Sequence, residues 1–150
     1  MSYGLYVLSA RESDKDNGCI VDAAAQVANE PTRLAISVQK ENLTGEMIRH
    51  TGLFNLSVLT EDAPFRTFQH FGMQSGRDTD KFAELSSVKR SSNGLLYLTE
   101  NTNALISCKV ISSTDLGSHT LFIGEVTESK VLSQKPSCTY AHYQKVIKPQ

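Results

Sequence analysis

The sequence predicts a single mainly β domain, an antiparallel β-barrel or sandwich with short helices. Short runs rich in β-branched and aromatic residues alternate with turn signals along most of the 150 residues. The expected strands follow one another through hairpins instead of long helical crossovers, which argues against a doubly wound parallel sheet. The length fits one domain spanning residues 1–150.

Six or seven strands are expected. We assign them to residues 4–11, 19–27, 33–39, 53–60, 95–99, 104–112 and 118–132. Asp14 to Gly18, which contains the favoured hairpin dipeptide Asn17-Gly18, is expected to form the turn between the first two strands, and Thr114 to Gly117 is expected to join the last two. Ala23 to Ala25 locally favours helix, but the preceding hairpin signal favours a strand there.

Two short helices interrupt the strands. The first is expected to be capped by Asn42 or Thr44 and to end at Gly52. The second opens at Pro64, which suits a first helical turn. Phe65, Phe68 and Phe71 share one face of this helix, and this face is expected to pack either inward or on a partner. Residues 72–94 form the longest irregular stretch, and residues 133–150 form a terminal extension.

Composition excludes several classes of function. The 15 Lys+Arg and 16 Asp+Glu give a net charge of -1, so a general nucleic-acid binder is not expected. No apolar run is long enough to span a bilayer, and Met1 to Leu5 has no signal-peptide character, so we expect a cytoplasmic domain. Cys19, Cys108 and Cys138 lack metal-ligand spacing and are expected to be buried thiols, with no metal site. Rossmann, Walker and HExxH motifs are absent.

Residues 37–44 carry the most informative pattern, because a strand ends and a helix begins within them. The first amides of a helix lack internal partners, and the helix dipole adds positive potential there. Lys40, Asn42 and Thr44 crowd the same place. This combination predicts a pocket for a phosphate monoester, with an ordinary capped helix beside a solvated lysine as the alternative.

An ordered set of motifs covers nearly the whole chain. They are Tyr3 to Val7, Asn17 to Val21, Gln26-Val27, Pro31, Ser37 to Thr44, Thr51 to Leu59, Ser75 to Phe82, Ser118 to Val126, Thr139 to Tyr143, and Lys148-Pro149. In this order they resemble the flavin-reductase-like family of FMN-binding split barrels, in particular the branch of flavoredoxins and the flavin domain of high-molecular-weight rubredoxins.

The resemblance implies a six-stranded antiparallel split barrel of Greek-key type that forms a homodimer and binds FMN near the dimer interface. The cofactor-binding residues that it implies are Val21, Asp22, Ala23, Ala24, Ser37, Val38, Gln39, Lys40, Asn42, Thr44, Ser75 and Arg77. His119 is the catalytic candidate, orienting a nicotinamide or a proton donor, or else it caps the barrel rim. The tail around Tyr140 and Tyr143 is expected to cover the site.

Three functions remain open. The first is an NAD(P)H-dependent FMN oxidoreductase that passes reducing equivalents to flavin or another acceptor. The second is an electron-transfer module that serves a rubredoxin-type or other redox protein. The third is a binding protein without cofactor, because Asp22-Ala23 stands where relatives tend to have Asn-Thr. A carboxylate beside the flavin would disfavour its reduction, so Asp22→Asn is expected to raise the flavin potential.

Overall fold

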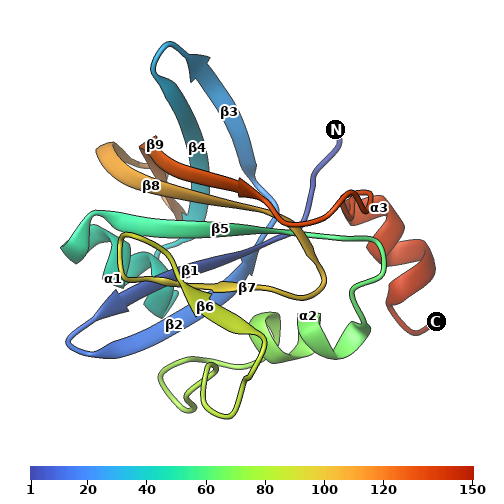
Figure 1. Cartoon of the computed structure of the whole chain (residues 1–150). Helices are drawn as coiled ribbons and strands as arrows, with labels where there is room; N and C mark the ends of the chain where they lie inside the picture. The colour runs from blue at the N-terminus through green and yellow to red at the C-terminus, as the bar shows by residue number, and fades with distance from the viewer.

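A computed structural model describes all 150 residues. Strands dominate and the helices are short, which confirms the mainly β class (Figure 1). The strands are β1 (Tyr6–Glu12), β2 (Lys15–Val21), β3 (Ala24–Asn29), β4 (Thr32–Gln39), β5 (Leu53–Leu59), β6 (Val88–Arg90), β7 (Leu96–Leu98), β8 (Thr102–Asp115) and β9 (His119–Val131). The helices are α1 (Leu43–Thr51), α2 (Phe65–Gly72), α3 (Tyr140–His142) and the π-helix η1 (Tyr143–Ile147).

The main sheet closes on itself through a bend in the chain. Its seven strands run in the order β2-β1-β5-β8-β9-β4-β3, and all neighbours are antiparallel. The two edge strands, β2 and β3, are consecutive in sequence and separated only by Asp22 and Ala23. The Ser37 amide donates to the Ala23 carbonyl at 3.0 Å, which links the bend to β4. With β2 and β3 taken as halves of one bent strand, the sheet is a six-stranded barrel.

This bend corrects the single strand expected over 19–27, which is in fact the end of β2, the bend, and the start of β3. The turn expected over Asp14 to Gly18 lies earlier in the chain: β1 and β2 pair from Glu12 opposite Lys15, so the turn is at residues 13–14 and Asn17-Gly18 is not part of it. Both turn residues have positive φ, 51° and 63°, as a tight hairpin turn requires. Gly18 instead lies within β2, where an added Cβ would stand 3.2 Å from the Leu8 carbonyl.

The helices agree with the sequence. Asn42 caps α1 by accepting the Thr44 amide at 2.8 Å, and Gly52 ends the helix with a φ of 73°. Pro64 precedes α2, and Phe68 and Phe71 of that helix are buried. These two rings therefore pack inward against the barrel, in a cluster with residues of β1, β5 and the C-terminal tail.

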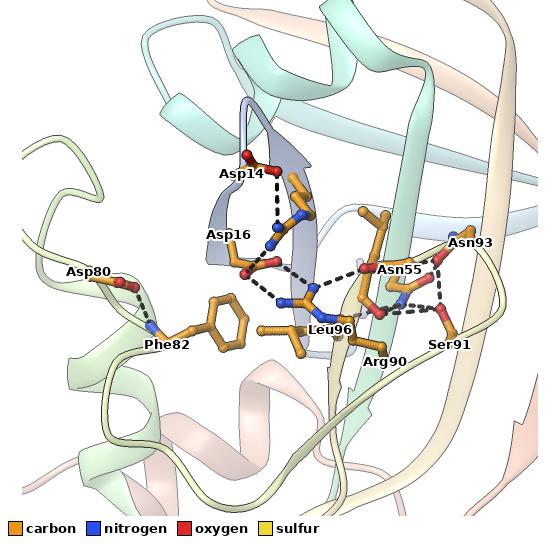
Figure 2. Close-up of polar contacts among 12 residues, drawn as sticks. Asp14, Asp16, Asn55, Asp80, Phe82, Arg90, Ser91, Asn93 and Leu96 are labelled. Atoms are coloured by element: carbon orange, nitrogen blue, oxygen red, sulfur yellow. Dashed lines mark hydrogen bonds and ion pairs between the residues drawn. The ribbon is translucent and has the colours of Figure 1, made fainter.

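The stretch 72–94, expected to be irregular, contains β6, which pairs with β7. Two polar clusters fix this hairpin to the barrel (Figure 2). Arg90 donates to both carboxylate oxygens of Asp16, at 2.9 and 3.0 Å, and Arg11 reaches the same carboxylate at 2.7 Å. The buried amide of Asn55 donates to Ser91 Oγ at 2.9 Å. A barrel strand thus anchors the hairpin through side chains that no periodic pattern reveals.

The tail beyond β9 returns to the barrel. The amide of Cys138 donates to the Leu59 carbonyl at 2.8 Å, and the Leu5 amide donates to the Cys138 carbonyl at 3.2 Å. The three cysteines are buried and free, as predicted. None of the helices is both long and apolar enough to cross a membrane.

Candidate functional site

The largest cavity, of about 470 Å³, opens where β2 ends, β4 ends and α2 packs against the barrel. Residues from β2, β4 and the helix α2 line it together with the C-terminal tail, whose Tyr143 packs on Phe68 with ring centroids 4.6 Å apart. Tyr140 stands beside Tyr143, at a centroid distance of 6.2 Å. One side of the cavity is therefore an aromatic wall built by the tail and α2.

A second cavity of about 430 Å³ continues from the first. The two share Gln39, Asn42, Gly72, Met73, Gln74 and Lys81 in their walls. The second cavity runs along the start of α1 and beneath the residues that follow α2. Together they form one elongated site with an aromatic end and an end at a helix N-terminus.

The N-terminal end of α1 gives this second end its chemistry. Asn42 and Leu43 line the second cavity, so the positive end of the helix dipole faces it. Asn17, only 1% exposed, lies in the same wall and donates through Nδ2 to Thr44 Oγ1 at 2.9 Å. Its other amide atom, Oδ1, has no hydrogen-bond partner in the protein. Buried polar atoms are normally paired, but Gly76 packs directly on this oxygen, so the unpaired atom marks a tight contact with the residues that follow α2.

Lys81 lies where the two cavities meet. It is only 3% exposed, and its ammonium donates to the carbonyls of Gly18 and Phe71, at 2.8 Å each. An ammonium has three donors, so one remains beyond these two carbonyls. No carboxylate pairs with it, and burial lowers the pKa of Lys81, although the nearby Cys19 thiol acts in the opposite direction. A buried cation without a counterion is costly unless an anion compensates it.

The first cavity carries two further polar groups, Asp22 and His119. Asp22 is the one carboxylate in the wall of the first cavity, and no cation forms an ion pair with it. His119 begins β9 opposite Gln39, and its Nδ1 lies 2.7 Å from Ser118 Oγ. Because Nδ1 has this neighbour, Nε2 is the ring nitrogen left for a ligand. The site suits a flat aromatic group at one end and an anion at the other.

The cavity walls bring together eight of the residues implied by the resemblance. The first cavity contains Val21, Asp22, Ser37, Val38, Gln39, Asn42 and His119, and the second contains Ser75. Thr44 lies just beneath the floor, fully buried and bonded to Asn17. Their roles toward a cofactor stay predictions.

Besides Thr44, four implied residues lie outside both walls. Ala23 and Ala24 form the bend and the first residue of β3, so their contribution is to barrel closure. Lys40 pairs with Asp115 at 2.5 Å and lines a separate shallow hollow. Arg77 pairs with Glu46 of α1 at 2.5 Å. The structure thus directs Lys40, expected at the phosphate, and Arg77, expected at the cofactor, toward carboxylates.

Sequence reasoning missed Lys81, Asn17 and the wall formed by Met73 and Gln74. Lys81 stands in the motif Ser75 to Phe82, of which only Ser75 and Arg77 were predicted to bind the cofactor. Its burial depends on Gly18 and Phe71, which are distant in sequence, so composition carries no sign of it. Asn17 resembled a turn residue because the dipeptide Asn17-Gly18 is a hairpin signal.

Comparison with known proteins decides the family. The model of the flavin reductase like domain matches residues 1–149. The chain belongs to this family. It is 38% identical to the high molecular weight rubredoxin of Moorella thermoacetica over 97% of this chain, but it spans only 63% of that relative. It is 32% identical to the ferric-chelate reductase (NAD(P)H) of Archaeoglobus fulgidus, covering 95% of this chain and 84% of the relative.

Solved structures share the fold of this flavin reductase-like chain. Flavoredoxin from Methanosarcina acetivorans superposes with a TM-score of 0.79 at 19% identity, over 89% of this chain and 70% of the other. The NADH:FAD oxidoreductase SgcE6 of Streptomyces globisporus C-1027, in complex with NAD and FAD fragments, superposes with a TM-score of 0.83 at 20% identity. The superposition covers 95% of this chain and 82% of the other. At this level of identity the likeness establishes the split-barrel fold and not the ligand.

Proposed function

We propose that this chain is an FMN-dependent oxidoreductase that accepts reducing equivalents from NAD(P)H. The observation that carries the proposal is the buried ammonium of Lys81, without a carboxylate partner, at the junction between an aromatic cavity and a second cavity that runs along the start of α1. A phosphate monoester supplies the missing negative charge, and an isoalloxazine matches the aromatic wall. Family membership and relatives named for NAD(P)H-dependent reduction support the same conclusion.

In this proposal the protein positions the cofactor and tunes its surroundings. FMN, when bound, supplies the hydride and electron chemistry. Lys81 and the first amides of α1 hold the phosphate. Tyr143 and Phe68 pack against the ring end and exclude water, while His119 Nε2 orients a nicotinamide or delivers a proton at the open rim.

A second candidate function is electron transfer without direct use of NAD(P)H. The relative from Moorella thermoacetica favours it, because its name includes a rubredoxin and this chain spans only 63% of its length. In that case a separate redox protein exchanges electrons with the bound flavin. The same cavity serves both functions, and only the electron donor differs.

The proposal includes a homodimer. Most residues of β3 are exposed although the strand belongs to the main sheet, and Val27 is 56% exposed. The β3–β4 hairpin projects from the body of the barrel (Figure 1). A projecting strand with an unpaired edge is a ready pairing surface, which a second copy can cover.

Anaerobic mixing of the FMN-loaded protein with NADH or NADPH tests the proposed function. We expect the absorbance of the oxidised flavin to fall after mixing, because the nucleotide reduces the flavin, at a rate that rises with nucleotide concentration. Reduction by a reduced rubredoxin but by neither nucleotide would establish the second candidate instead. A protein that binds no flavin at all would refute both and favour a binding protein without cofactor.

A further inference from the structure

Residues 72–77, here called the strap, form one side of the second cavity. The strap begins at the last residue of α2, and five consecutive members, Gly72 to Gly76, line the cavity. The opposite side is the start of α1, with Asn42 and Leu43. The strap therefore crosses the end of the site where the proposed phosphate lies.

Two contacts at Gly76, near the end of the strap, hold it against the barrel. The Lys15 ammonium donates to the Gly76 carbonyl at 2.5 Å. Gly76 also lies directly on Asn17, since an added Cβ would stand 2.1 Å from Asn17 Oδ1. Glycine is required at this point because any side chain would push the strap away from the cavity floor.

A third contact joins the strap to the opposite wall. Arg77 Nη2 donates to Glu46 Oε2 at 2.5 Å and to the Glu41 carbonyl at 3.3 Å. Both side chains of the ion pair are partly exposed, 48% for Arg77 and 34% for Glu46. Partly exposed pairs are weak and exchange with water, so this contact can break and re-form while the barrel stays folded.

We propose that Arg77 and Glu46 are positioning residues that keep the strap closed over the phosphate end and thereby retain FMN as a bound prosthetic group. The inference rests on the proposed function, since it assumes that FMN occupies the joined cavity. Arg77 acts through Glu46 and does not bind the phosphate, because its guanidinium already meets a carboxylate whereas Lys81 has none. Breaking the pair opens one wall and accelerates release of the ligand.

The rate of flavin dissociation tests this inference. Loaded wild-type protein, Glu46→Gln and Arg77→Gln are diluted rapidly, and the recovery of free flavin fluorescence is followed. We expect both variants to release FMN about two- to fivefold faster, and the double variant no faster than either single one. Lys135→Gln is the matched control, since it breaks a partly exposed ion pair with Asp62 outside both cavities, and its release rate should equal that of the wild type.

Two readouts separate the strap from direct phosphate binding. A wall that opens releases riboflavin faster as well, although riboflavin has no phosphate. If Arg77 instead held the phosphate, Glu46→Gln would free its guanidinium and slow FMN release, and Arg77→Gln would leave riboflavin release unchanged. Either result would overturn the inference, as would unchanged rates in both variants. A wild-type protein that binds no FMN would overturn the proposed function itself.

Discussion

Replacing Lys81 by methionine removes the charge at the phosphate end while keeping the length of the side chain. The structure gives Lys81 two carbonyl partners at 2.8 Å and one further donor at the junction of the two cavities. A hydrogen bond to a charged group contributes about 1.5–3 kcal/mol. With about 1.4 kcal/mol for each tenfold in affinity, Lys81→Met should weaken FMN binding about 10- to 150-fold.

The assay is a fluorescence-quenching titration with FMN and with riboflavin. Riboflavin lacks the phosphate, so its affinity should change little in Lys81→Met. Lys40→Met is the matched control, because Lys40 was the lysine expected at the phosphate from sequence, yet it pairs with Asp115 outside both cavities. We expect its FMN affinity to stay near that of the wild type. A larger loss in Lys40→Met than in Lys81→Met would refute the reasoning.

The pH dependence of FMN binding gives an independent check on Lys81. Burial lowers the pKa of Lys81 below the ordinary 10.5, so this ammonium loses its proton earlier than a surface lysine as pH rises. The charge that attracts the phosphate is present below the lowered pKa and is lost above it. FMN affinity should therefore decline on the alkaline side before pH 10.5, and Lys81→Met should remove this decline.

Three further predictions concern the ring end and the barrel. Asp22→Asn should raise the midpoint potential of the bound flavin by on the order of tens of millivolts, because it removes a negative charge from the cavity wall; spectroelectrochemistry measures it, and an unchanged midpoint would exclude this role. Gly124→Ala should lower the free energy of unfolding by about 1–3 kcal/mol, since the added Cβ would stand 2.8 Å from the buried Phe54 ring; a urea titration that finds no loss would contradict this. Burial raises the pKa of Asp16, but its hydrogen bonds to two arginines outweigh this and lower it below 3.8. The stability that Asp16 contributes is therefore present above pH 3.8 and is lost as pH falls through the lowered pKa. Asp16→Asn should lower the free energy of unfolding by about 1 kcal/mol at neutral pH and should reduce the loss of stability between neutral and acid pH. An equal loss of stability with acid in the variant and the wild type would contradict this.

Local signals predicted the elements whose causes are local. The Asn42 cap, the Gly52 stop and the Pro64 start are each set by a few neighbouring residues, and α1 and α2 appear where these signals place them. The hairpin between β8 and β9 follows its turn residues in the same way, with the Gly117 amide bonded to Asp115 at 2.8 Å.

The incorrect predictions concern places where closure of the whole barrel, and not the local sequence, determines the backbone conformation. Nothing near Asp22 reveals that the chain must bend there, because the bend exists to connect the two edges of the sheet. Asn17-Gly18 has strong turn propensity, but the register with β1 places it inside a strand. The strand–helix junction at residues 37–44 was a sound guide to one wall of the site. Sequence alone does not show which lysine lines the cavities, since Lys40 and Lys81 differ in what the fold brings beside them: a carboxylate at Lys40, and two carbonyls at Lys81.

The central claim is that FMN binds in the joined cavity with its phosphate at the start of α1. A titration of the wild-type protein with FMN and with riboflavin, followed by flavin fluorescence, tests it most directly. We expect saturation at one FMN per chain, and we expect riboflavin to bind about tenfold or more weakly than FMN. Equal affinities would show that the Lys81 end of the cavity holds no phosphate, and the absence of binding by either flavin would contradict the account.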